Sequence, residues 1–300
     1  VLANVKHDDE VITQALTFVA TANAISYTGA SIIFIDSEKE TMGMCPVELE
    51  SFLSKNCIIK DDGYTYNKKT NKRIAACVPM HVFGHPLKIN EIMKVCEKYN
   101  ITVIEDAAES LGSYYKTKHT GLFGKMGILS FNGNKTITTG GGGMIITNDE
   151  AIAKRAMHIT KTAKVPHQWE FIHDEIGYNY RLSNLNAAVG CAQMEHLADF
   201  LKDKRDLAGK YKEFFSGAGI EFFSEPKDCV SNYWLNAIVL NSRQERDEFL
   251  KETNADGVMT RPIWRLMNKL PMFKDCESTK LETAQWLEDR VVNIPSSVRL

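Results

Sequence analysis

A lysine and an aspartate each stand at the end of a predicted strand, where a covalent cofactor could be held. Asp106 follows the run 101–105, and Lys135 follows the run 127–131 through an Asn-Gly-Asn turn whose residues can adopt left-handed backbone angles. Parallel sheets bind ligands at the carboxyl ends of their strands. Pyridoxal phosphate requires this pair, because the amine forms a Schiff base with its aldehyde and the carboxylate holds a proton on its ring nitrogen. A hydride-transfer enzyme would need neither residue.

Each candidate residue also has an ordinary structural explanation. Taken alone, Asp106 is at least as well explained as a helix N-cap, and a lysine at an arbitrary position is usually a solvated charge. Ser130 and the glycines at 140–143 offer a hydroxyl and backbone N–H groups to a phosphate, but four glycines equally suit a hairpin bend. Phe18 could stack on a cofactor ring or belong to the core.

The elements that must position these residues alternate between β-branched runs and helical patterns. Strands are expected at 10–13, 31–35, 74–78, 101–104, 127–131 and 143–147, with apolar residues at helical spacing in 89–96 and 152–156. Such alternation predicts an α/β fold, in which helices cover both faces of a mainly parallel sheet. No Gly-x-Gly-x-x-Gly or P-loop motif occurs, which argues against nicotinamide-binding and P-loop folds.

The last third of the chain has the pattern of a smaller α+β domain. A long connecting helix is expected from 183 to 215, followed by a strand at 233–240 and helices near 243–253 and 281–290. We therefore expect a large cofactor-binding domain at 1–195 and a small C-terminal domain at 196–300. The polar, turn-rich residues 60–73 are expected to form a surface excursion.

Composition argues against several other classes of protein. The 36 basic and 38 acidic residues give a net charge of -2, unlike a nucleic-acid binder that neutralises phosphates. Seven cysteines without a Cys-x-x-Cys pair indicate reduced thiols in the cytoplasm, with neither a disulfide framework nor a metal site. No apolar run is long enough to span a membrane, and the first residues do not resemble a secretion signal. The abrupt start at Val1 suggests that part of the large domain precedes it.

Six segments together resemble the DegT/DnrJ/EryC1/StrS family of sugar aminotransferases. In the family's order and spacing they are residues 9–12, 16–23, 103–112, 127–135, 142–149 and 177–188. Among them, 103–112 reads Val-Ile-Glu-Asp-Ala-Ala-Glu-Ser-Leu-Gly and 127–135 reads Gly-Ile-Leu-Ser-Phe-Asn-Gly-Asn-Lys. The resemblance covers nearly the whole chain. It implies the type I fold of pyridoxal-phosphate-dependent transferases, with a sheet of the seven-stranded type and a small α+β domain.

The resemblance also implies a role for each matching residue. Lys135 matches the lysine that carries the cofactor, and Asp106 matches the partner of the pyridine nitrogen. Phe18 matches the aromatic residue that stacks on the ring, and Ser130 matches a phosphate ligand. Glu109 matches the residue near the phenolic oxygen, which is usually glutamine or histidine in relatives.

Other matches concern the neighbouring subunit and the substrate. Asn179 matches an asparagine that reaches the cofactor phosphate of a neighbouring subunit, which implies a homodimer with shared active sites. Arg181 could meet a nucleotide diphosphate, and Trp264 could border the sugar pocket or pack in the small domain. Residues 132–135, 261–264 and 293–297 look most like the legionaminic acid branch of the family. That branch aminates a UDP-linked 4-keto-6-deoxy-N-acetylhexosamine, with L-glutamate as the usual donor, in bacterial nonulosonic-acid or surface-polysaccharide biosynthesis.

Two departures from the family pattern concern the phosphate site. A Gly-Thr segment that helps to seat the phosphate would precede Val1, and Gly141 stands where many relatives have glutamate. Two alternative functions stay open. A related cofactor-dependent sugar dehydratase has histidine in place of the lysine, so Lys135 argues against it. A non-catalytic regulatory relative would keep the fold, and only an assay distinguishes it. His81 and His85 are expected to be structural.

Overall fold

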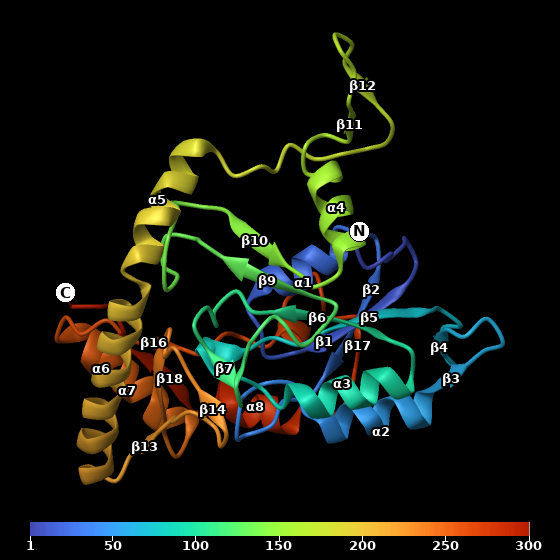
Figure 1. The fold of residues 1–300 in the computed structure, drawn as a ribbon. Helices are drawn as coiled ribbons and strands as arrows, with labels where there is room; N and C mark the ends of the chain where they lie inside the picture. The colour runs from blue at the N-terminus through green and yellow to red at the C-terminus, as the bar shows by residue number, and fades with distance from the viewer. Residues whose placement is uncertain (300) are drawn as a thin grey trace.

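The computed structural model describes residues 1–299, and its centre is a seven-stranded sheet (Figure 1). Neighbouring strands are parallel except that β10 runs antiparallel to β9. The six strands expected here lie within two residues of their predicted bounds, so the mainly parallel sheet is confirmed. In spatial order the strands are β10 (Gly143–Ile146), β9 (Met126–Ser130), β6 (Thr102–Asp106), β5 (Ile74–Val78), β1 (Glu10–Gln14), β2 (Ser31–Ile35) and β17 (Glu277–Ser278).

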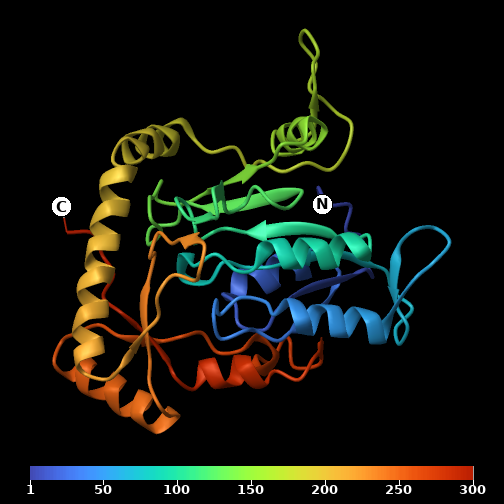
Figure 2. The same ribbon diagram turned by 60° about the horizontal axis from the view of Figure 1, so that its bottom comes forward.

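Helices cover both faces of this sheet because successive apolar residues of its central strands point to opposite sides. Ile12 and Ile33 belong to a core cluster with α2 (Pro46–Asn56) and α3 (Ile89–Lys98), which lie side by side in Figure 2. The adjacent residues Val11 and Ile32 pack in a second cluster, which includes α1 (Val19–Ser26). The fourth helix, α4 (Glu150–Ile159), follows β10 and begins after the N-cap Asp149.

The C-terminal region builds a second, four-stranded sheet beside the long helix α6 (Leu197–Gly217). Its strands, in spatial order, are β13 (Glu221–Phe222), β15 (Asn236–Val239), β18 (Val291–Ile294) and β16 (Arg261–Pro262). Two further helices are α7 (Arg243–Ala255) and α8 (Glu282–Glu288), and both occur where helices were expected. The expected strand at 233–240 is shorter, since only its last half pairs in this sheet. Within residues 1–299, no helix combines the length and apolarity needed to cross a membrane.

Asp36, directly after β2, links the N-terminal part of the chain to its C-terminal part through hydrogen bonds. Its Oδ2 accepts the N–H of Thr283 at 2.9 Å and its Oδ1 accepts the N–H of Ala284 at 2.8 Å. These N–H groups belong to the first turn of α8, where no donor has an intrahelical acceptor. Just before α8, β17 pairs with β2 and completes the large sheet. The division at residue 195 stays a prediction, and the C-terminal segment returns across it to the large sheet.

The predicted single helix at 183–215 is wrong. Two helices, α5 (Asn184–Glu195) and α6, meet at His196, whose φ of -101° and ψ of 0° depart from helical values. The two helices have different surroundings, because α5 buries no residue whereas α6 packs on the small sheet through Ala208 and Phe215. No proline marks the break, so periodicity alone continued the helix through it.

Three short hairpin-like units project from or cover this framework. The excursion expected at 60–73 lies largely in an antiparallel hairpin of β3 (Cys57–Ile59) and β4 (Thr65–Asn67) with its exposed turn. A small sheet joins β14 (Cys229–Val230) to β7 (Tyr114–Tyr115) and β8 (Lys118–His119). A hairpin of β11 (Lys164–Val165) and β12 (Ile172–His173) extends away from the body in both Figure 1 and Figure 2.

Glu105 lies beside Asp106 in β6 but is completely buried, in contact with a tight turn. Its carboxylate accepts three backbone N–H groups from residues 121–124 at 2.5 to 2.8 Å and lies 3.1 Å from Nε2 of His81. Nδ1 of the same ring accepts the N–H of Leu87. Burial acts to raise the pKa of Glu105, but His81 and the backbone donors outweigh burial and lower it. His81 therefore has the structural role that was expected.

His85 is buried as a neutral ring. Among residues 1–299, neither of its ring nitrogens has a hydrogen-bond partner. The ring meets Phe223 and Tyr233 edge-on, with centroids 4.9 and 5.2 Å away. Burial lowers the pKa of His85 to about 3, and the nearby carboxylate of Glu225 opposes this shift. A structural role is therefore confirmed for His85 also.

We expect His85 to make the protein sensitive to acid. The unfolded chain protonates this ring near pH 6.5 and the folded chain near pH 3, so stability falls as the pH falls through this interval. The loss is on the order of 5 kcal/mol when fully developed. Urea unfolding at a series of pH values should show a shallower fall for His85→Phe than for the native protein. The exposed His7 provides the control His7→Phe, and equal pH profiles for all three proteins would contradict neutral burial.

Candidate active site

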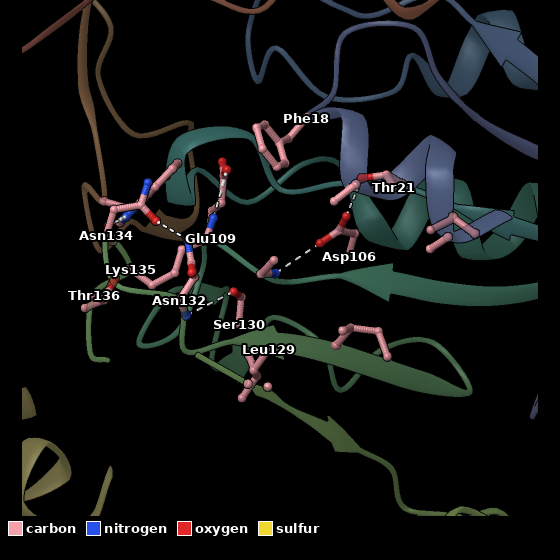
Figure 3. Close-up of a pocket in the computed structure, with 18 of the residues that line it drawn as sticks. Phe18, Thr21, Asp106, Glu109, Leu129, Ser130, Asn132, Asn134, Lys135 and Thr136 are labelled. Atoms are coloured by element: carbon pink, nitrogen blue, oxygen red, sulfur yellow. Dashed lines mark hydrogen bonds and ion pairs between the residues drawn. The ribbon is translucent and has the colours of Figure 1, made fainter. Parts of the chain in front are cut away.

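One large cavity extends along one face of the large sheet to the carboxyl ends of β6 and β9 (Figure 3). Its volume of about 1850 Å³ exceeds that of a typical small-molecule pocket, roughly 300–1,000 Å³, and leaves room for a substrate beside a cofactor. Six of the eight residues predicted for the site line this cavity. They are Phe18, Asp106, Glu109, Ser130, Lys135 and Trp264.

Asp106 is the last residue of β6, and both of its oxygens have protein donors. Oδ2 accepts the hydroxyl hydrogen of Thr21 at 2.6 Å, and Oδ1 accepts the N–H of Ala108 at 3.1 Å. These donors fix the orientation of the carboxylate. Thr21 was not predicted, although it lies three residues after Phe18 on α1, and this helical spacing could have placed the two side chains on one face.

Lys135 lies in the loop after β9, on the side of the cavity opposite Asp106 in Figure 3. Its side chain is 11% exposed, and Nζ lies 3.3 Å from Oε1 of Glu109 and 4.0 Å from the ring centroid of Trp234. The backbone N–H of Lys135 closes a turn onto the carbonyl of Asn132 at 3.0 Å. The turn does not use the left-handed angles that its residues can adopt, because none of residues 132–134 has a positive φ. An ordinary turn is enough to present the lysine.

Glu109 is buried between the lysine and a backbone N–H. Its Oε2 accepts the N–H of Phe83 at 2.9 Å while Oε1 faces Lys135. Burial raises the pKa of Glu109 to about 8, although Lys135 and the Phe83 N–H act to lower it and Asp106 adds to the rise. This carboxyl group can therefore carry a proton at neutral pH.

Aromatic and hydroxyl groups complete the wall of the cavity. Phe18 precedes α1 and is 47% exposed, so it does not belong to the core, and its ring meets Trp264 edge-on with centroids 6.2 Å apart. Ser130 ends β9 beside Gly142 and Gly143, which also line the cavity. Gly142 has a φ of +107°, which a residue with a side chain would adopt only under strain.

Asn179 and Arg181 lie outside this set of lining residues. Both are exposed, in the segment between the β11–β12 hairpin and α5. The structure therefore brings six predicted site residues together in one subunit and leaves these two on the surface. Asn232 and Trp234 contact the Lys135 loop but were missed, because they lie about 100 residues further along the chain and no motif marks them.

The cavity fits pyridoxal phosphate chemically. Asp106, held by two donors, faces the space from one side and the amine of Lys135 from the other, while the exposed ring of Phe18 lies beside both (Figure 3). The hydroxyl of Ser130 is available to a phosphate oxygen at the strand end. A mainly parallel sheet with this set of groups beyond its carboxyl edge defines the class of pyridoxal-phosphate-dependent transferases.

Comparison with known proteins narrows this class. A model of the DegT/DnrJ/EryC1/StrS aminotransferase family matches residues 1–300, and the chain belongs to that family. It is 37% identical over 292 residues to GDP-perosamine synthase of Escherichia coli O157:H7, covering 97% of this chain and 75% of that protein. The corresponding values for GDP-perosamine synthase of Vibrio cholerae are 30% over 291 residues, 96% and 74%.

Solved structures share the fold at lower identity. Helicobacter pylori PseC, an aminotransferase involved in pseudoaminic acid biosynthesis, superposes with a TM-score of 0.85 at 20% identity, over 98% of this chain and 77% of that one. DesV of S. venezuelae, solved in complex with a ketimine intermediate, gives 0.84 at 23% identity, over 98% and 76%. The chain is thus a pyridoxal-phosphate-dependent aminotransferase.

Proposed function

We propose that this enzyme transfers the amino group of L-glutamate to the keto carbon of a nucleotide-linked 4-keto-6-deoxy sugar. The observation that carries the proposal is the placement of Lys135 with Glu109, and of Asp106 with Thr21, on opposite sides of one cavity that has room for a second molecule. Aminotransferases of sugars are named among its relatives, including two GDP-perosamine synthases. The exposed guanidinium groups of Arg261 and Arg265 line the same cavity and suit a diphosphate.

The protein side chains have separate tasks in this proposal. Bound pyridoxal phosphate supplies an aldehyde for covalent attachment and a ring that takes up the electrons of a broken C–H bond. Asp106 keeps a proton on the ring nitrogen. Nζ of Lys135 removes a proton from the donor carbon that carries the amino group, and returns a proton when the acceptor sugar is aminated. Ser130 binds phosphate oxygen, and Phe18 fixes the plane of the ring.

A homodimer with shared active sites is part of the proposal. Five large apolar side chains between the tip of the projecting hairpin and α5 are 71% to 89% exposed, which indicates a surface that another chain covers. They are Trp169, Phe171, Ile176, Tyr180 and Leu185. A second copy of this chain would cover these side chains. Asn179 and Arg181, which lie in the same segment, would then reach the active site of that second copy. Light scattering should give the mass of a dimer, and a monomeric mass at micromolar concentration would contradict this part.

The reaction is tested by incubating the full-length enzyme with cofactor, L-glutamate and a panel of nucleotide-linked 4-keto-6-deoxy sugars. UDP-linked N-acetylhexosamine derivatives represent the legionaminic acid branch, and GDP-linked sugars without the acetamido group represent perosamine synthesis. We expect mass spectra to show loss of oxygen and gain of NH in the UDP-linked N-acetyl sugar. Preference for a GDP-linked sugar would overturn the finer assignment but keep the reaction. We place the reaction in the cytoplasm, which the seven free cysteines support.

The same assay distinguishes the alternative functions. A dehydratase would remove a hydroxyl group without adding nitrogen, and a regulatory relative would bind the sugar without changing its mass. Either result across the whole panel, with cofactor bound, would reject the aminotransferase proposal.

A further inference from the structure

A three-residue segment from the C-terminal region, Asn232–Trp234, forms hydrogen bonds with the loop that carries Lys135. The segment directly precedes Leu235 and β15, and it contacts the loop on both sides of the lysine. Trp234 donates its indole N–H to the carbonyl of Asn134 at 2.7 Å, and Asn232 donates to the hydroxyl of Thr136 at 3.2 Å. The two neighbours of Lys135 in the chain are therefore fixed by one external element.

Asn232 is fully buried and has no unused hydrogen-bonding group. Besides Thr136, its Nδ2 lies within hydrogen-bond distance of the carbonyls of Glu109 and Leu111, at 2.8 and 2.9 Å, and its Oδ1 accepts the N–H of Trp234. A Cβ on Gly84 would stand 1.8 Å from this Oδ1, so the Asn232 side chain packs directly against a glycine that no larger residue could replace without a shift. Asn232 thus joins the backbone of Glu109, the Lys135 loop and Trp234.

Trp234 also confines the amine itself. Its ring centroid lies 4.0 Å from Nζ of Lys135, while Oε1 of Glu109 lies 3.3 Å from the same atom. An indole face attracts a nearby ammonium group, and a carboxyl group does so more strongly when ionised. The amine is thereby held between two side chains from different parts of the fold, and Asp106 is the other charged group near Glu109.

Trp234 is in turn held from behind by a buried lysine. Lys204 of α6 donates to the carbonyl of Trp234 at 3.2 Å and to that of Ser296 at 2.7 Å. Its side chain is almost fully buried, and burial lowers the pKa of Lys204 to about 8. A buried amine at this position ties the segment to α6 and to the end of the chain.

We propose that Asn232 and Trp234 are positioning residues for Lys135. They hold the backbone on either side of the lysine and limit the directions that its amine can take, so that it meets the aldehyde of the cofactor. The inference rests on the proposed role of Lys135. In this proposal, a segment of the C-terminal region helps to set the geometry of the active site through its contacts with the Lys135 loop.

The test separates covalent attachment of the cofactor from its total binding. Cofactor-free enzyme is mixed with pyridoxal phosphate, and samples are reduced with borohydride at intervals. The mass of the peptide that contains Lys135 reports attachment, and equilibrium dialysis reports total binding. The variants are Trp234→Phe, which keeps a ring but loses the N–H donor, Trp234→Leu, which loses both, and Asn232→Ala. Trp286→Leu is the matched control, because this half-buried tryptophan of α8 does not line the cavity.

We expect Trp234→Leu and Asn232→Ala to slow attachment about tenfold or more, in keeping with the strong dependence of intramolecular reactions on orientation. Total binding should change much less. Trp234→Phe should lie between Trp234→Leu and the native enzyme, and hydrogen exchange of residues 133–136 in the cofactor-free protein should rise in all three variants. Trp286→Leu should leave both measurements unchanged.

Attachment as fast as, or faster than, that of the native enzyme in Trp234→Leu and Asn232→Ala would overturn the inference. Should Trp234→Leu fail to fold, as judged by thermal unfolding, Trp234→Phe and Asn232→Ala still decide it. Lys135→Ala distinguishes the proposed covalent role of Lys135 from the positioning role of Asn232 and Trp234. Trapping of the cofactor on another lysine of this variant at the native rate would remove the proposed role of Lys135. Loss of trapping in Lys135→Ala with native rates in the other variants would remove only the positioning role.

Discussion

Lys135→Ala should abolish covalent attachment of the cofactor and lower the rate of transamination by more than about 10⁴-fold. In the proposed mechanism the amine has two tasks, attachment and proton transfer, and general acid–base catalysis alone typically contributes a rate factor of about 10² to 10⁴. Its neighbour Glu109, 3.3 Å away, is a buried carboxyl group and cannot form the covalent bond in place of the amine. The visible absorption of the lysine-bound cofactor and single-turnover rates with glutamate measure the two effects.

A matched lysine controls for the loss of charge. Lys251 is exposed on α7 and does not line the cavity, so Lys251→Ala should keep native spectra and rates. Because Lys135→Ala leaves the carboxylate of Asp106 and the hydroxyl of Ser130 in place, the variant should still bind the cofactor without a covalent bond. Substantial turnover by Lys135→Ala would exclude this lysine from the chemistry.

Asp106→Asn is expected to have the second largest effect, a loss of about 10² to 10³ in kcat/KM. This is the range for removal of one preorganised electrostatic contact, and asparagine cannot supply the negative charge that keeps a proton on the ring nitrogen. The variant keeps the shape of the side chain, so its fold and cavity should be preserved. Half-reaction rates with glutamate, measured at saturating cofactor, report the loss without the complication of weaker cofactor binding.

Thr21→Val provides the graded comparison for Asp106. It removes the 2.6 Å hydrogen bond to Oδ2 but keeps the carboxylate and its contact with the N–H of Ala108. We expect a smaller loss than for Asp106→Asn, because the charge remains while one of its donors is gone. Native half-reaction rates in Asp106→Asn would show that the carboxylate does not act on the cofactor.

The sheet and the central pair of site residues could be predicted from sequence because their signals are local. Apolar β-branched runs located six of the seven strands of the large sheet, and strand ends locate ligand sites in parallel sheets. Lys135 and Asp106 each directly follow such a run, so their convergence needed no knowledge of the rest of the fold. The structural interpretation of the buried histidines also had a local basis, since both flank the short helical turn at 82–84 that follows β5.

Features that depend on tertiary packing could not be predicted in this way. Apolar spacing continued the helix through His196 because a sequence pattern does not report that α5 and α6 have different surroundings. Trp234 contributes through a contact with a loop about 100 residues earlier, and neither residue type nor spacing indicates it. Asn179 lies on the surface of one chain, so its proposed contact requires a partner that the pattern of one chain cannot describe.

The late segment that contains β17 and α8 pairs with β2 and donates hydrogen bonds to Asp36, and this has a consequence for biosynthesis. The carboxylate emerges from the ribosome early, but the N–H groups that it accepts belong to residues 283 and 284. Until that late stretch is made, β2 has an open edge, and an unpaired strand edge can associate with other nascent chains. Translation that stops before residue 277 should therefore release an aggregation-prone product, even though Asp106 and Lys135 have already been incorporated.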